Sequence, residues 1–280
     1  MDAREEIARD LSPAALVNVI EANMFSFFPS WRRWPKAEVH DDPELLWTLT
    51  SIPSPFFNSV FRARLNPEAV EGAIAAAIAR GRARGVLLRW WTGPTTHPAD
   101  LPKYLIARGF VGEELPGMAA DLRALPDTVP APSELVIERV TELGALKTWC
   151  DVMCTSFDLP GVFAEGWYDS WRSLGVSPRA PYRHYLGWLE GEPVATSAVI
   201  FGAGVAGIYN VGTLPAVRRQ GIGTALTLVP LLEVRAMGYR IAIVHSSPMA
   251  VGAYRHLGFE EYCKIGTYVW ANEQKDADVS

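Results

Sequence analysis

Hydrophobic and polar positions in the second half of the chain alternate between short apolar runs and helix-like spacings. The apolar run over residues 205–213 predicts a strand, and the apolar positions of residues 224–237 recur at helical spacing. Residues 239–245 form a further apolar run, residues 249–257 predict a short helix, and residues 259–270 predict a last strand. The end of the chain therefore predicts a strand–helix–strand–helix–strand order.

The segments before this series also show strand and helix patterns. The expected strands are 135–140, 182–189 and 193–201, and the expected helices are 142–156 and 164–174. The tripeptide Glu190-Gly191-Glu192 joins the second and third of these strands, which predicts a hairpin.

The first half of the chain shows a similar series of patterns. In order, it predicts a helix within 1–34, short strands within 37–49, a strand over 56–65, a helix from Asn66-Pro67 to residue 82, a strand over 86–91, a helix over 98–108 and a strand over 110–122. Residues 124–133 contain three prolines and no periodicity, which is typical of a linker. We therefore expect two domains, at 1–125 and 134–271, joined by a linker at 126–133 and followed by a charged tail at 272–280.

Composition narrows the class of protein. The formal net charge of −5 argues against nucleic acid as the main partner. No apolar window approaches about 18 residues, the length that a membrane-spanning helix requires, and no basic-then-apolar signal opens the chain. The cysteines Cys150, Cys154 and Cys263 form neither a disulfide framework nor a metal-ligand spacing. These features favour a cytoplasmic protein without a metal.

Residues 218–223, with the sequence RRQGIG, connect the strand at 205–213 to the following helix. Two glycines in a strand-to-helix connection allow the backbone to approach a ligand closely. The free N–H groups of the first helical turn, together with the charges of Arg218 and Arg219, suit a phosphate group. The alternative is an ordinary glycine-containing loop with solvated arginines.

This loop resembles the acyl-CoA pyrophosphate loop of the GNAT superfamily of N-acetyltransferases, Arg/Gln-x-x-Gly-x-Gly/Ala, with Arg218, Gly221 and Gly223 at the motif positions. A second match follows at residues 253–259, AYRHLGF, which are similar to the family's (A/L)YxxxGF element. The resemblance covers residues 134–271. It implies an α+β (α/β three-layer) fold, with a mixed, mostly antiparallel central sheet flanked by helices, and acetyl-CoA as the acyl-donor substrate.

The resemblance also implies which residues bind the donor. Backbone groups of residues 211–213 are expected to pair with the pantetheine arm, and the family's strand carries a bulge that frees an N–H for the thioester oxygen. Ser247 stands where many relatives have an asparagine that contacts CoA. The expected donor-binding residues are Val211, Gly212, Thr213, Arg218, Arg219, Gln220, Gly221, Ile222, Gly223, Thr224 and Ser247.

Tyr254 occupies the position of the family's general-acid tyrosine. A phenol that stays protonated at neutral pH suits the protonation of a leaving thiolate, and a tyrosine that only packs on the sheet is the alternative. Because residues 241–244 offer no carboxylate, the first candidate for the base is His245, at the end of that strand. Glu165 and Asp158 are weaker candidates.

Three further groups of residues allow two interpretations each. Trp167 and Trp171 lie one helical turn apart, in the region that borders the acceptor in relatives, and they either line an acceptor pocket or fill the core. The tripeptide His40-Asp41-Asp42 is either a ligand cluster or a turn built on aspartate side chains before Pro43.

The third group is an internal repeat. Residues 105–110 (LIARGF) are similar to residues 254–259 (YRHLGF), and in the register that follows, Ala69 and Glu71 occupy the places of Gly221 and Gly223. A carboxylate and two Cβ atoms at these places would repel CoA. We therefore expect two tandem GNAT-like domains with a degenerate N-terminal copy, the alternative being a chance Gly-Phe match between unrelated halves.

The expected function is that of an acyl-CoA-dependent N-acyltransferase, which transfers acetyl from acetyl-CoA to a primary amine of a small molecule. We expect a monomer or homodimer without nucleic-acid or membrane partners. A non-catalytic CoA-binding sensor or scaffold, and an acetyltransferase that acts on protein N-termini or lysines, are the alternatives.

Overall fold

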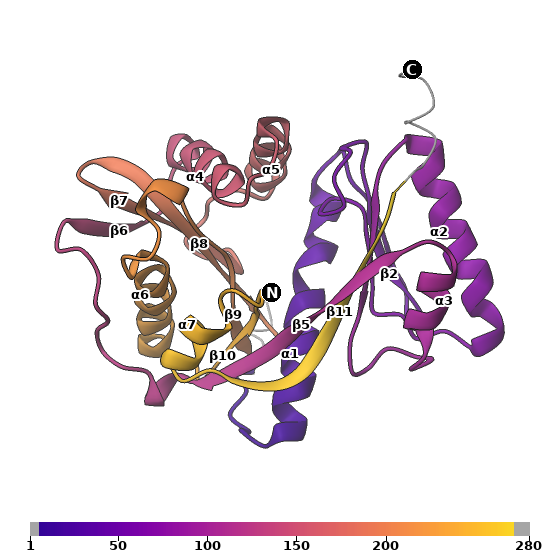
Figure 1. Ribbon diagram of the computed structural model, residues 1–280, viewed down its shortest axis with the longest axis horizontal. Coiled ribbons are helices and arrows are strands. Elements are labelled where there is room, and N and C mark those ends of the chain that lie inside the picture. Colours follow the sequence, from indigo (N-terminus) through magenta and orange to yellow (C-terminus); the bar gives the residue numbers. More distant parts are fainter. Residues whose placement is uncertain (1–5, 272–280) are drawn as a thin grey trace. The chain divides into compact units, whose positions relative to one another are not determined.

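The structure is a computed structural model that describes residues 6–271 (Figure 1). It divides into two compact units, and each unit is built from two separate stretches of the chain. Among the described residues, unit 1 comprises 6–27 and 116–262, and unit 2 comprises 28–115 and 263–271. The predicted charged tail at 272–280 lies outside the described residues.

These units differ from the consecutive domains that we expected at 1–125 and 134–271. Strand β5 (Val111–Asp121) ends in unit 1, where residues 117–121 pair antiparallel with β10 (Ile241–His245). Strand β11 (Glu260–Trp270) ends in unit 2, where residues 266–270 pair antiparallel with β4 (Leu88–Thr92). An apolar run predicts that a strand exists, but it does not specify the sheet that the strand joins.

Unit 1 contains a mixed and mostly antiparallel sheet. Its remaining strands are β6 (Leu135–Arg139), β7 (Tyr182–Leu189), β8 (Glu192–Gly202) and β9 (Val205–Thr213). The strand order is β5-β10-β9-β8-β7-β6, in which β9 and β10 run parallel and the other neighbours run antiparallel. The mixed sheet flanked by helices confirms the predicted fold class.

The helices of unit 1 cover both faces of this sheet, with α4 and α5 on one face and α6 on the other (Figure 1). They are α1 (Pro13–Phe27), α4 (Leu143–Ser156), α5 (Gly161–Leu174), α6 (Ile222–Ala236) and α7 (Val251–His256), with 3₁₀ turns η3 (Leu122–Ala124) and η4 (Pro215–Val217). Leu226 and Val234 of α6 share a buried cluster with Ile208 and Val199. No helix within residues 6–271 has the length and apolar character needed to cross a bilayer.

Helix α1 belongs to unit 1, although it is distant in sequence from the other elements there. The Asn23 side chain donates to the carbonyl oxygens of Ile200, at 3.1 Å, and Gly202, at 3.0 Å, and accepts from the Tyr209 hydroxyl at 2.8 Å. The hydrogen bonds of this buried amide are thus directed at β8 and β9. The α-helix ends at Phe27 and is followed directly by the 3₁₀ helix of residues 28–33, since Pro29 has no N–H to donate to the carbonyl oxygen four residues earlier.

Unit 2 contains strands in the order β1-β2-β3-β4-β11, in which only β3 and β4 are parallel among the described pairs. Its other elements are η1 (Phe28–Arg33), β1 (Glu38–Asp41), β2 (Leu46–Leu49), β3 (Ser59–Phe61), η2 (Pro67–Ala69), α2 (Val70–Arg84) and α3 (Leu101–Ala107). Apolar residues of α2, including Ile74 and Ile78, are buried in one cluster with Trp90.

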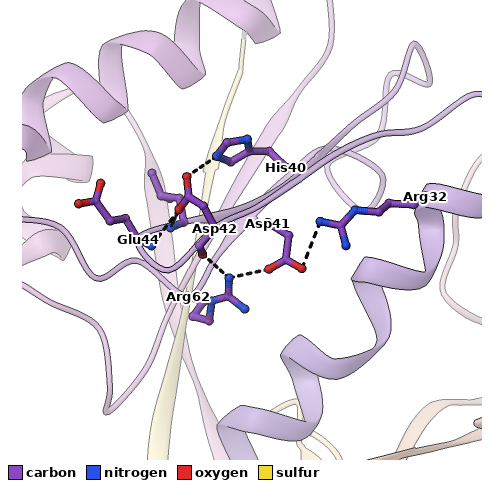
Figure 2. Close-up of polar contacts among 7 residues, drawn as sticks. Arg32, His40, Asp41, Asp42, Glu44 and Arg62 are labelled. Carbon is purple, nitrogen blue, oxygen red and sulfur yellow. Dashed lines mark hydrogen bonds and ion pairs between the residues drawn. The ribbon is translucent and has the colours of Figure 1, made fainter. Parts of the chain in front are cut away.

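Asp42 occupies the turn between β1 and β2 of unit 2 (Figure 2). One oxygen of its carboxylate accepts the backbone N–H of Glu44 at 2.8 Å, and the other lies 2.6 Å from His40 Nε2. Asp41 pairs with Arg62 at 2.6 Å. These contacts confirm the turn interpretation of His40-Asp41-Asp42, because the carboxylates are used within the protein. No group of three metal-ligating side chains is found in the described part of the chain.

Candidate functional site

A pocket of about 300 Å³ opens in unit 1 where strands β9 and β10 separate. The two strands pair in parallel only at Ala206 with Ala242 and at Gly207 with Ile243. The pocket is lined by the end of β9, the start of α6, helix α7 and the end of α4. Its lining residues are Ser156, Phe157, Val211, Gly212, Thr213, Val217, Arg218, Arg219, Gly221, Ile222, Gly223, Thr224, Thr227, Ser247, Met249, Ala250, Ala253, Tyr254 and Leu257.

Most of the predicted site residues lie together around this pocket. Ten of the eleven expected donor-binding residues line it, as does Tyr254. Gln220 and His245 are not among the lining residues. The sequence motifs therefore locate one concave surface, although they are spread over three elements.

A β-bulge directs the end of β9 into the pocket. Thr196 of β8 is opposite Gly212 and Ala198 is opposite Tyr209, so β9 holds one residue more than β8 between these pairs. Asn210 adopts a left-handed φ of 51°, and its carbonyl oxygen accepts the Thr196 hydroxyl at 2.9 Å. Such a bulge leaves a backbone residue unpaired in the ladder and bends the strand. The bulge that the family resemblance implies is therefore present at this strand.

The N-terminus of α6 forms another part of the pocket wall. Gly221 is its N-cap residue with φ of 82°, and an added Cβ there would lie 2.1 Å from the Pro130 carbonyl oxygen. Glycine is therefore required at 221 by the protein itself. At Gly223 the nearest atom to an added Cβ is the Thr213 hydroxyl oxygen at 3.5 Å, so the protein alone leaves room for a side chain. The free N–H groups of this first turn suit an anion.

Arg218 contacts the backbone rather than extending freely into the pocket. Its Nε donates to the Thr213 carbonyl oxygen at 3.0 Å, and its Nη2 donates to the Ser156 carbonyl oxygen at 2.8 Å. These bonds join the end of α4 to the end of β9. Arg219, which has a left-handed φ of 67°, also lines the pocket and adds a second positive charge.

Tyr254 of α7 is buried in the wall of the pocket, which Thr227 of α6 also lines. Burial raises the pKa of the Tyr254 phenol above its ordinary value, an effect that the nearby Thr227 hydroxyl partly offsets. The phenol is therefore protonated at neutral pH and can act as a proton donor. Sequence reasoning missed Thr227, although its place one helical turn after Gly223 puts both residues on the same face of α6.

His245 faces α1 at the end of β10. Its Nε2 donates to the Ile20 carbonyl oxygen at 3.1 Å, and its ring centroid lies 5.8 Å from that of Tyr209. Burial lowers the pKa of His245 to about 4, against a smaller opposing effect of the Ile20 hydrogen bond. The imidazole is thus neutral at physiological pH. The weaker candidates Glu165 and Asp158 do not line the pocket either.

Trp171 is a core residue of unit 1. Its ring centroid lies 4.8 Å from that of Phe27, 4.9 Å from Tyr182 and 4.3 Å from His184, and the side chain is almost fully buried. Trp167 stacks on it at 6.5 Å. The core interpretation of Trp171 therefore holds, and the acceptor-pocket interpretation of this residue is wrong.

Comparisons with known proteins agree with this arrangement. Residues 147–259 match the model of the acetyltransferase (GNAT) family, a range that includes every residue of the pocket lining. No curated protein sequence matches the chain significantly.

Solved structures match nearly the whole chain. A GCN5-related N-acetyltransferase from Kribbella flavida is similar with a TM-score of 0.65 and 17% identity, over 94% of this chain and 96% of the other. A GCN5-related N-acetyltransferase from Sphaerobacter thermophilus is similar with a TM-score of 0.59 and 16% identity, over 96% of both chains. A tandem GNAT protein from the clavulanic acid biosynthesis pathway has a TM-score of 0.56 and 16% identity, over 92% of this chain and 94% of the other. The fold is therefore that of GNAT acetyltransferases.

Proposed function

We propose that this protein is an acyl-CoA-dependent N-acyltransferase that transfers acetyl from acetyl-CoA to a primary amine of a small molecule. The observation that supports it best is the pocket itself. One cavity joins a bulged strand end, the free N–H groups of a helix N-terminus and a protonated tyrosine. An enzyme needs these three features to anchor a thioester that carries phosphate groups and to protonate the leaving thiolate.

In the proposed donor complex, the first turn of α6 and the Arg219 side chain hold the pyrophosphate. Residues 211–213 pair with the pantetheine arm through their backbone groups, and an N–H freed at the Asn210 bulge donates to the thioester oxygen. Gly223 leaves the space through which the phosphates reach the backbone. Arg218 holds the end of β9 in place through the Thr213 carbonyl.

In the proposed reaction the acceptor nitrogen attacks the carbonyl carbon, the C–S bond breaks with its electron pair going to sulfur, and the Tyr254 phenol gives its proton to sulfur. His245 is the proposed base, and its neutral form is the one that accepts a proton. Because a pKa of about 4 makes this imidazole a weak proton acceptor, we expect the rate to rise with pH as more of the acceptor amine is uncharged.

We further propose that the chain holds one donor site, because the corresponding segment of unit 2 is closed. The Leu65 N–H donates to the His97 carbonyl at 2.9 Å, and the His97 N–H donates to the Ala63 carbonyl at 2.9 Å. The N-cap residue of α2 is Ala69 with φ of −86°, and Glu71 in the first turn is paired with Arg108. A carboxylate at a helix N-terminus occupies the place that a phosphate needs. These features support a degenerate N-terminal copy.

A CoA-binding sensor without catalysis is the second candidate. The observation that favours it is that the pocket lining includes no carboxylate and no imidazole among the described residues. Cys150 and Cys154 are buried free thiols, which supports a reducing compartment such as the cytoplasm for either function.

The experiment that tests these proposals combines calorimetric titration with acetyl-CoA and a thiol-release assay over a panel of primary amines. One site per chain that Gly221→Glu abolishes, together with amine-dependent thiol release, is the expected result. Binding without thiol release from any amine favours the sensor. The absence of binding at millimolar acetyl-CoA contradicts both functions, and two sites per chain contradict the degenerate copy.

A further inference from the structure

Phe157 presents a half-exposed aromatic ring to the pocket of unit 1. The residue directly follows helix α4, is 47% exposed and belongs to the pocket lining. An aromatic ring in contact with water is unfavourable relative to one that apolar surface covers. Because this ring lines a concave surface, an apolar group of a ligand can cover it there.

The backbone at the end of α4 fixes the position of Phe157. The Phe157 N–H donates to the Cys154 carbonyl oxygen at 3.2 Å, and the Leu159 N–H donates to the same oxygen at 2.9 Å. Asp158, between them, has a left-handed φ of 54°, which is typical of a residue that ends a helix. The ring is therefore attached to a regular helix terminus and not to an irregular loop.

The ring lies against strand β9 at Gly212. An added Cβ at Gly212 would lie 2.6 Å from Ser156 Cβ and 3.2 Å from Phe157 Cε2, so the end of α4 packs directly on the strand. Glycine at 212 allows this close approach. Arg218 stabilises the same contact, because its Nη2 donates to the Ser156 carbonyl oxygen at 2.8 Å. Phe157 is thus a fixed part of the wall beside the residues that we propose to pair with the pantetheine arm.

Phe157 approaches the end of β9 from the face of the sheet that α4 covers. The proposed phosphate site is at the N-terminus of α6, which covers the other face (Figure 1). The ring therefore stands on the side of the strand away from the helix that would hold the phosphates. An acceptor that reaches the thioester from the α4 side passes this ring.

The charged side chains of the lining suit the phosphates of the donor better than a polycationic acceptor. They are Arg218 and Arg219, and the lining includes no carboxylate among the described residues. A second ammonium group on the acceptor would lose hydration in the pocket without gaining a counter-charge from its wall. The acceptor that fits has one amine and an apolar remainder.

We propose that Phe157 determines acceptor specificity and that the acceptor is a primary amine with an aromatic group, which packs on the Phe157 ring while the amine reaches the thioester. This inference rests on the proposed acyltransferase function. Aromatic pairs are favourable in offset-stacked and edge-to-face contact, which gives such an acceptor an advantage over a polar amine of similar reach. Contact of the ring with the pantetheine arm of the donor is the competing explanation.

The test compares two amines that share the aminoethyl unit, 2-phenylethylamine and ethanolamine. The readouts are kcat/KM for each amine and the Kd for acetyl-CoA. We expect the wild type to prefer 2-phenylethylamine by about tenfold or more. Phe157→Ala should remove most of this preference, because it lowers kcat/KM for 2-phenylethylamine by about tenfold and changes neither ethanolamine turnover nor the Kd appreciably.

Three further variants separate the effect of the ring from a general effect on the fold. Phe157→Tyr keeps the ring and should retain the preference. Phe157→Leu fills a similar space without the ring, so it should lose the preference and provides the same comparison if Phe157→Ala does not fold. Leu143 of the same helix is 42% exposed and does not line the pocket, so Leu143→Ala should leave the kinetics with both amines unchanged.

Two kinds of result would overturn the inference while the acyltransferase function stands. The first is a wild type that acylates ethanolamine or other polar amines as well as or better than 2-phenylethylamine. The second is an equal loss with both amines in Phe157→Ala, which assigns the ring to the donor if the Kd for acetyl-CoA also rises and to the fold if it does not. A wild type that binds acetyl-CoA but releases no thiol with any primary amine overturns both the inference and the proposed function.

Discussion

Tyr254 is the residue whose chemistry depends most directly on its surroundings. We expect Tyr254→Phe to lower kcat by about 10²- to 10⁴-fold, the usual contribution of a general acid. The ring contact with Phe259, at 5.6 Å between centroids, uses only the ring and is kept by phenylalanine. Steady-state kinetics at saturating acetyl-CoA measures the loss.

Calorimetry provides the control for this substitution. Because phenylalanine keeps the ring contact with Phe259, the fold and the affinity for acetyl-CoA should stay close to wild type. A variant that binds acetyl-CoA and turns over at the wild-type rate would leave Tyr254 with a packing role only.

Arg218 and Arg219 are adjacent in sequence, and their surroundings predict different effects of substitution. Arg218→Gln removes donors to the Thr213 and Ser156 carbonyl oxygens, so we expect the free energy of unfolding to fall by about 1 kcal/mol. Arg219→Gln should change stability by less than about 0.5 kcal/mol, as surface substitutions usually do. It should weaken acetyl-CoA binding in a manner that added salt reduces.

Urea unfolding and calorimetry at two salt concentrations measure these two effects separately. The opposite pattern, with Arg219 important for stability and Arg218 for salt-dependent binding, would contradict the geometry. The sequence motif predicted a phosphate role for both arginines, because a motif contains no information about which carbonyl oxygens lie nearby.

At the scale of elements, the junction between β9 and α6 depends on Gly221. Gly221→Ala places a Cβ 2.1 Å from the Pro130 carbonyl oxygen at a left-handed φ of 82°, so it should destabilise the protein and abolish acetyl-CoA binding. Gly238→Ala is the matched control, because φ is 93° there and an added Cβ meets open space among the described residues.

The comparison of the two variants isolates the steric effect. Gly238→Ala should lower the free energy of unfolding by about 1–2 kcal/mol, the cost of a left-handed conformation for alanine, and should leave acetyl-CoA binding intact. The difference between the two unfolding free energies then measures the collision with Pro130. Equal losses of stability would show that position 221 needs glycine for its φ alone.

Most elements of this junction were predictable from the sequence, because their signals are local. The apolar run of β9, the glycine loop and the helical spacing of α6 all lie within one stretch of chain. Thr227 was not predicted as a lining residue, because the pocket wall that it shares with Tyr254 includes a helix beyond the next strand. The neutral, α1-facing environment of His245 likewise depends on Ile20, 225 residues away in sequence.

At the scale of the whole molecule, the order of the chain did not predict the membership of the units. Residues 117–121 of β5 and the helix α1 complete unit 1, although both precede the predicted linker. We therefore expect an isolated fragment 134–271 to lack a stable fold, because β10 loses its antiparallel neighbour and β8 and β9 lose Asn23. Circular dichroism and thermal unfolding of the fragment measure this, and a cooperative transition like that of the full chain would contradict it.

The buried His184 and the partly buried His245 give unit 1 a pH dependence of stability. Burial lowers the pKa of His184 to about 3 and that of His245 to about 4, both below the ordinary value near 6.5 that applies in the unfolded chain. At a pH between the folded and the unfolded pKa of each histidine, the unfolded state binds more protons than the folded state. The stabilising effect of each neutral imidazole is therefore fully present above about pH 6.5 and is lost as pH falls towards the folded pKa.

Urea unfolding between pH 8 and pH 5 measures this dependence. Each histidine contributes at most about 1.4 kcal/mol per pH unit below pH 6.5, and the contribution of His245 is smaller to the extent that its side chain reaches solvent. His184 is the sharper test, because its ring is enclosed by Trp149 at 4.5 Å and Trp171 at 4.3 Å, and its Nε2 has no hydrogen-bond partner among the described residues. His184→Leu should therefore flatten the acid side of the stability profile, and a variant that loses stability as steeply as wild type would assign the proton uptake to other groups.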